Sequence, residues 1–103
     1  MLALMKEKKL AAVQAEIAAE RAAALSLSEG KLKRSLSALK SFDAKPVGRR
    51  SRAELVDAAA EACLGFVVQR ESMGIGAHNM RTVLADFDIP DEVWNRMGAT
   101  KPS

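Results

Sequence analysis

Residues 51–73 read SRAELVDAAAEACLGFVVQRESM and hold no proline. Ser51 and Glu54 have the spacing of a capping box, in which the serine hydroxyl accepts the amide three residues on and the glutamate returns to the N-cap amide. Apolar residues then recur at helical spacing in adjacent rows, and Glu54, Asp57 and Glu61 form the main polar edge. A helix with so broad an apolar surface has neighbours on several sides. Residues 51–73 are therefore predicted as a central helix.

The composition favours helices along the whole chain. Nineteen of the 103 residues are alanine, the best helix former but one with little side chain to bury, and 30 are large apolar residues. There is no tyrosine, and valine, isoleucine and threonine rarely alternate with polar residues as they do in strands. We therefore predict an all-α fold, a small helical bundle that forms a single domain over residues 1–103. Its thin core also favours self-association.

The first 42 residues are predicted as a long, alanine-rich helical region. Leu10, Val13 and Ile17 are spaced three and four apart, which makes one apolar stripe on a helix, and the stripe weakens after Ile17. It is too sparse for a long regular coiled coil and is typical of a short hairpin or of a helix that needs a partner. Gly30 can break the region into two helices or lie within one, because glycine costs only about 1 kcal/mol in a helix. Both alternatives stay open.

Turn residues set the remaining boundaries. Pro46 biases the residue before it away from helical angles, Pro90 suits a first helical turn, and Gly98 suits a helix end. The predicted segments are an internal linker over 43–50, short helices over about 77–87 and 90–97, and a frayed tail over 99–103.

Charge divides the chain into two unlike halves. Residues 1–52 carry 12 Lys/Arg and 5 Asp/Glu, a net +7, whereas residues 53–103 carry 4 and 8, a net −4, which together give +3. The basic residues of 31–52 are candidates for contact with nucleic acid. They can equally meet the acidic half of the same chain or of a second copy, and we favour that interpretation. Arg49, Arg50 and Arg52 are then part of a solvated basic turn.

Residues 71–81, ESMGIGAHNMR, are the one stretch that resembles a site. A dinucleotide fingerprint needs a third glycine where Asn79 stands, and it needs a preceding strand where a helix is predicted. His78 lacks companions for a metal site, because no second histidine exists and Cys63 lies about fifteen residues away. We predict a corner between helices, with His78 partly exposed in the first turn of the next helix.

No catalytic, cofactor-binding or metal-ligating residue is predicted, nor is a small-molecule ligand, and we expect no enzyme. Cys63 is expected to be a small buried hydrophobe. Asp91 and Glu92 open the last helix and would repel phosphates, which argues against a helix-turn-helix reader of DNA.

A cytoplasmic location is expected. The N-terminus does not read as a secretory signal, and no apolar run approaches the roughly 20 residues of a membrane span. The alanine-based stripe of the first helix would insert weakly into a membrane surface, so membrane association is not expected. With a single cysteine the chain can form no internal disulfide.

Several helix landmarks resemble a family of short, uncharacterised bacterial all-helical proteins. They are AEIAAERAAAL (15–25), SFDA (41–44), FVVQRE (66–71) and IPDEVWNRMG (89–98). The resemblance spans most of the chain and implies a compact helical domain of unknown function. It implies no activity, cofactor or site.

The leading functional hypothesis is a small helical protein that acts through protein–protein contacts, as a homodimer or a larger homo-oligomer. The alternative is a nucleic-acid-associated protein that uses the basic residues of 31–52.

Overall fold

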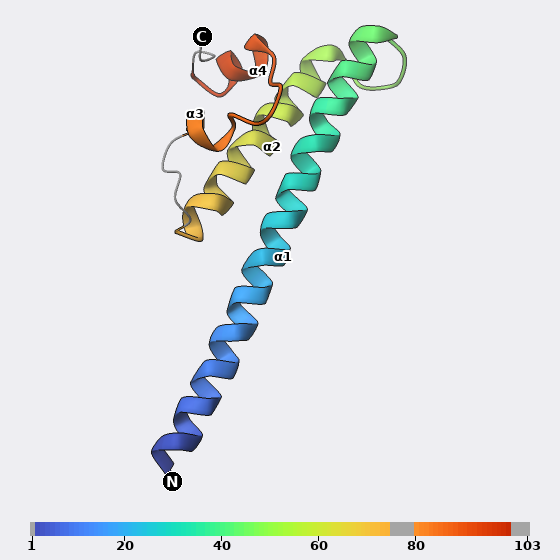
Figure 1. The fold of residues 1–103 in the computed structure, drawn as a ribbon. Helices are drawn as coiled ribbons and strands as arrows, with labels where there is room; N and C mark the ends of the chain where they lie inside the picture. Colours follow the sequence, from blue (N-terminus) through green and yellow to red (C-terminus); the bar gives the residue numbers. More distant parts are fainter. Residues whose placement is uncertain (1, 75–79, 100–103) are drawn as a thin grey trace.

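The computed structural model describes residues 2–74 and 80–99, with side chains described from Glu7 onward (Figure 1). Four helices follow one another along the chain: α1 (Leu2–Ala44), α2 (Arg52–Ser72), α3 (Met80–Val83) and α4 (Asp91–Arg96). No strand occurs in these ranges. The prediction of an all-α fold is confirmed.

Helix α1 is continuous, so of the two alternatives at Gly30 the broken helix is wrong. Apolar residues on both sides of Gly30 pack against the core, among them Leu25 and the fully buried Leu32. This packing outweighs the roughly 1 kcal/mol that a glycine costs inside a helix. The helix ends at Ala44, so the link to α2 is two residues shorter at its start than the predicted 43–50.

Helix α2 is the central helix, as predicted, because it contacts α1 along one side and α3 and α4 along another (Figure 1). The Ser51 hydroxyl accepts the Glu54 N–H at 3.2 Å, which confirms the N-terminal cap. The helix ends at Ser72, and Gly74 follows with a φ of +65°. Glycine adopts this left-handed conformation at little cost, so Gly74 turns the chain out of the helix.

Beyond α2 the chain forms only short helices. Helix α3 spans four residues, so the predicted helix over 77–87 is wrong in its second half, where residues 84–86 form a turn. The turn is required because it places the buried Ile89 against the core before α4 begins. Helix α4 lies within one residue of its predicted bounds, with Pro90 as N-cap and Gly98 at a φ of +79° just after it. His78 and the rest of 75–79 lie outside the described residues.

The core lies between the second half of α1, helix α2 and the segment from α3 to α4 (Figure 1). Its largest fully buried side chains are Leu32, Leu39, Leu84, Ile89 and Val93. Ala99, predicted as the start of the tail, packs against this core, and its N–H donates to the Trp94 carbonyl at 3.1 Å.

The first half of α1 extends away from the other helices (Figure 1). Every residue from Glu7 to Ala23 is exposed. We call residues 7–23 the arm, and the described residues 24–74 and 80–99 the body. The molecule measures 66 × 31 × 18 Å, and its radius of gyration is 18.3 Å, against about 13 Å for a compact chain of this length. The arm therefore makes the protein elongated.

Candidate interaction surface

The arm carries an apolar stripe that no other described part of the chain covers. Leu10, Val13 and Ile17 are 58%, 49% and 42% exposed. At spacings of three and four residues they lie on one side of the helix. The positions beside the stripe, three or four residues away along the helix, are polar or charged, so the stripe is narrow. They include Lys9, Gln14, Glu16, Glu20 and Arg21. From this stripe the sequence predicted either a short hairpin or a helix that needs a partner.

The stripe is uncovered because α2 is too short to reach it. Asp43 and Arg52 join α1 to α2 beside the turn, and α2 then runs back along α1 for 21 residues. At equal rise per residue it reaches back to about residue 23 of α1. Burial on α1 begins at Ala24 and Leu25, in agreement with this length.

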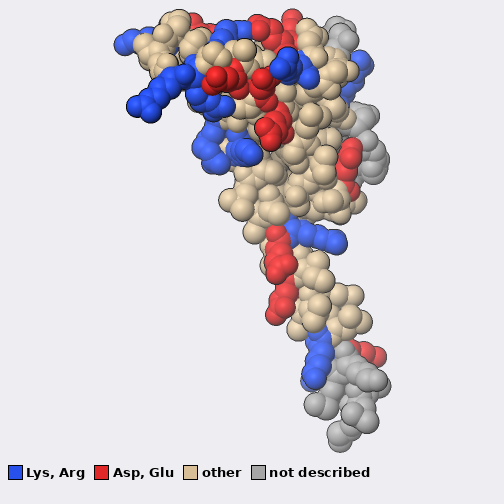
Figure 2. Space-filling view, turned by 180° about the vertical axis from the view of Figure 1, so that it is seen from behind, with Lys and Arg blue, Asp and Glu red and all other residues tan. Residues whose placement is uncertain are grey.

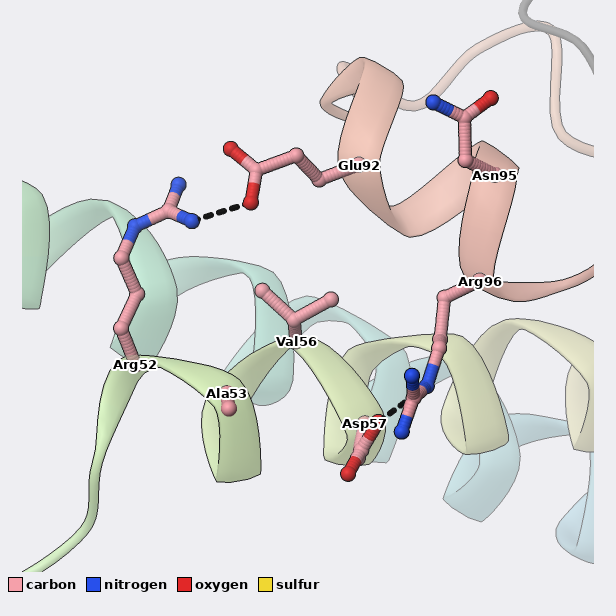
Figure 3. A pocket seen from close by; sticks show the side chains of 7 residues that line it. All are labelled: Arg52, Ala53, Val56, Asp57, Glu92, Asn95 and Arg96. Atoms are coloured by element: carbon pink, nitrogen blue, oxygen red, sulfur yellow. Dashed lines mark hydrogen bonds and ion pairs between the residues drawn. The ribbon is translucent and has the colours of Figure 1, made fainter.

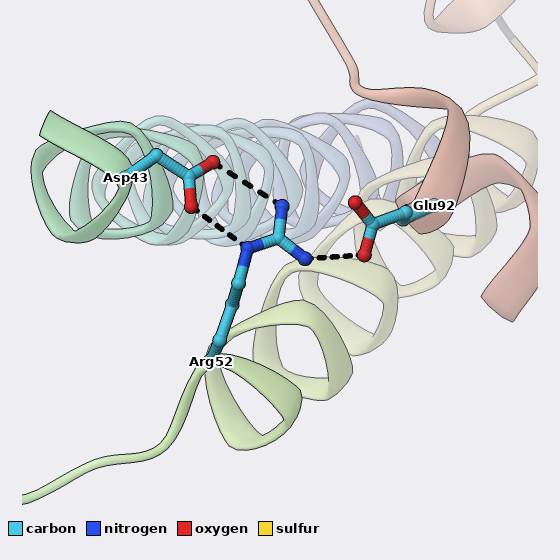
Figure 4. Close-up of polar contacts among 3 residues, drawn as sticks. All are labelled: Asp43, Arg52 and Glu92. Atoms are coloured by element: carbon cyan, nitrogen blue, oxygen red, sulfur yellow. Dashed lines mark hydrogen bonds and ion pairs between the residues drawn. The ribbon is translucent and has the colours of Figure 1, made fainter. Parts of the chain in front are cut away.

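Arg52 connects three helices at the opposite end of the body (Figure 4). Its Nε and Nη2 donate to the two carboxylate oxygens of Asp43 at 2.7 and 3.2 Å, and its Nη1 donates to Glu92 of α4. Hydrogen bonds from Arg52 lower the pKa of Asp43, and the two carboxylates raise that of the Arg52 guanidinium. Asp43 therefore adds stability at neutral pH that is lost as the pH falls below about 4. The sequence placed Arg52 in a solvated basic region and gave no signal of this arrangement.

A second ion pair extends the contact between α2 and α4. Arg96 pairs with Asp57, and this pair and the Arg52–Glu92 pair border a hollow of about 460 Å³ with Val56 on its floor (Figure 3). Ala53 and Asn95 also line it. Each of its four charged groups is already paired within the chain, so the hollow offers no free charge to a ligand. Its side chains hold α4 on α2.

The basic residues of 31–52 divide into paired and unpaired groups. Arg52 forms ion pairs with Asp43 and Glu92, and Lys33 pairs with Glu29 at 3.0 Å. Lysine and arginine side chains project at the end of the molecule where α1 turns into α2 (Figure 2). Lys45, Arg49 and Arg50 line a hollow of about 500 Å³ there, whose apolar part includes Phe42, Val47 and Leu55. We call these three cations the basic turn; no ion pair to the described residues holds them.

Cys63 is fully buried, as predicted. Burial raises the pKa of its thiol to about 12, so the thiolate is scarce at neutral pH and the side chain is a poor nucleophile. The described residues contain no group of three or more histidine, cysteine, aspartate or glutamate side chains placed to hold a metal ion. Among the described helices, none is both long and apolar enough to cross a membrane.

Fold and surface together define an α-helical hairpin protein with short C-terminal helices and an uncovered N-terminal arm. A family model described as a family of unknown function, DUF6665, matches residues 2–103, and the chain belongs to this family. The resemblance to an uncharacterised family is thereby confirmed. No curated protein and no solved structure matches the chain.

Proposed function

We propose that the protein acts through protein–protein contacts made by the arm, and that it self-associates as a homodimer through the stripe of Leu10, Val13 and Ile17. The observation that carries the proposal is the exposure of these three side chains on a helix that continues past its intramolecular partner. The arm is supported only by the helix that it continues, and packing of an amphipathic face is what usually stabilises helices in proteins. A second copy provides such packing.

The area of the stripe sets the strength of the pair. Covering the exposed parts of three large side chains in each copy contributes roughly 6–9 kcal/mol. Lost translational and rotational freedom costs at least about 4 kcal/mol. The difference is at most about 5 kcal/mol, so we expect a weak dimer, with a Kd no tighter than about 0.2 mM.

Val13→Glu is expected to abolish self-association, because it places a charge in the middle of the stripe. In sedimentation equilibrium from about 10 µM to 1 mM, the unsubstituted protein should rise in average mass from 11.1 kDa toward twice that value. The Val13→Glu variant should stay at the monomer mass throughout.

The matched control is Val68→Glu, an equal change at a valine of α2 that is 63% exposed. It should dimerise like the unsubstituted protein. A parent chain that stays monomeric at about 1 mM contradicts the proposal. So does a Val68→Glu variant that loses the dimer while Val13→Glu retains it.

The proposed role is cytoplasmic and non-enzymatic. A chain with one cysteine gains no disulfide from an oxidising compartment, and the ion pairs of the described hollow between α2 and α4 serve to join helices. These features support the proposal.

Binding of nucleic acid by the basic residues of 31–52 is the second candidate. It is favoured by the unpaired cations of the basic turn, which gather at one end of the molecule (Figure 2). It is weakened by Arg52 and Lys33, whose charges are used within the chain.

If the three cations of the basic turn contact phosphates, affinity for duplex DNA should fall about 40-fold between 50 and 200 mM salt. Replacing Arg49 and Arg50 together by alanine should remove most of the binding. Replacing Lys8 and Lys9 by alanine removes an equal number of positive charges from the arm and should leave the DNA binding unchanged. Absence of binding at about 50 mM salt would exclude this candidate.

A further inference from the structure

Charge is distributed unevenly along the arm. Its outer end carries Glu7, Lys8 and Lys9, a net +1. Its inner end carries Glu16, Glu20 and Arg21, a net −1. Figure 2 shows both acidic and basic side chains along the arm. Two arms that lie side by side are therefore complementary in charge when they point in opposite directions.

Glu20 strengthens this preference because of its position. It follows Ile17 by three residues and so continues the line of the stripe toward Ala24. In a parallel pair the two Glu20 carboxylates meet within the contact, where like charges repel. In an antiparallel pair each Glu20 lies near the outer end of the second copy, whose described side chains Glu7, Lys8 and Lys9 carry a net +1.

The position of the stripe also suits a two-fold axis across the arm. Val13 lies between Leu10 and Ile17, so an axis near Val13 places each Leu10 beside the Ile17 of the other copy. Glu7 of one copy then lies beside about residue 20 of the other. Helix α1 begins at Leu2, so in this register it extends to about residue 25 of the other copy, where the partner's α2 helix begins to cover α1.

We propose that two copies pair through antiparallel arms, with a two-fold axis near Val13 and the two bodies at opposite ends of the assembly. This inference rests on the proposed self-association and adds its orientation. The two α1–α2 turns then lie about 90 Å apart, since each is about 30 helical residues from the axis. The dimer presents its two basic turns as separate, identical surfaces at the ends of a helical spacer.

The orientation can be measured with a spin label at Ser26, an exposed residue of α1 just after the inner end of the arm. In the antiparallel dimer of Ser26→Cys, the two labels lie about 40 Å apart along the helix axis. In a parallel dimer they lie at the same level, within roughly the 8–10 Å spacing of paired helices plus the label lengths. A pulsed dipolar distance near 40 Å supports the proposal, and one below about 20 Å overturns it.

Native Cys63 does not interfere, because it is 0% exposed and its thiol has a pKa of about 12. The unsubstituted protein treated with the same reagent checks this. A second label at the exposed Ser37 gives an independent reading, with about 70 Å expected for the antiparallel pair. A dimer by sedimentation with short distances at both sites overturns the orientation alone. A monomer by sedimentation, with no distance between labels, overturns the proposed self-association as well.

Discussion

Phe66→Ala is expected to lower the free energy of unfolding by about 3–5 kcal/mol, a large share of the 5–15 kcal/mol that stabilises a typical domain. Phe66 lies near the middle of α2 and is 3% exposed. Its ring packs edge-on against Phe87, with centroids 5.4 Å apart and planes inclined by 73°. Removing it leaves a cavity between α2 and the segment that follows α3. Alanine and cysteine neighbours such as Ala59, Ala62 and Cys63 are too small to fill that cavity.

Urea denaturation followed by fluorescence measures this loss, because Trp94 is the only tryptophan and is 3% exposed. The control is Val68→Ala, two residues further along α2 and 63% exposed, which should change the free energy of unfolding by no more than about 0.5 kcal/mol. A loss below about 1 kcal/mol for Phe66→Ala would show that the ring does not hold α2 against the C-terminal segment.

Helix α2 could be predicted nearly to the residue because local chemistry sets both its ends. Ser51 and Glu54 are close in sequence, and their hydrogen bond forms within one helical turn. The breadth of apolar positions likewise predicted its central place, since no single neighbour can cover such a surface. Gly98 after α4 follows the same rule of local end signals.

Where distant contacts decide the structure, the sequence either left alternatives open or predicted the wrong one. Gly30 has a local preference against helix, but Leu25 and Leu32 beside it pack against the core and keep α1 continuous. The spacing of Met80, Val83, Leu84 and Phe87 fits a longer helix, yet the chain turns at 84–86 to bring Ile89 into the core.

The candidate surface was partly readable from the sequence. Leu10, Val13 and Ile17 form a stripe that is too sparse for a long coiled coil. This spacing indicated either a short hairpin or a helix in need of a partner. Its exposure could not be predicted, because this depends on how far α2 runs back along α1. Arg52 gave no signal either, since its partners Asp43 and Glu92 lie 9 and 40 residues away.

A chain that begins at Ala24 is expected to keep the body folded and to lose self-association. The buried core lies between Leu32 and Trp94, and Leu25 is the first partly buried residue to pack against it. The arm contributes no described contact to the body, so its removal should change the free energy of unfolding of the monomer by no more than about 1 kcal/mol.

Two measurements separate the arm from the body. Sedimentation of the shortened chain should give a monomer up to about 1 mM. Its urea midpoint should be independent of protein concentration, whereas that of the full chain should rise with concentration because dimerisation is linked to folding. A shortened chain that still dimerises would place the interface on the body, where Leu64 and Val68 are exposed on α2. A shortened chain that loses cooperative unfolding would mean that the body needs the arm to fold, and the division of the molecule into a stable body and a docking arm would be wrong.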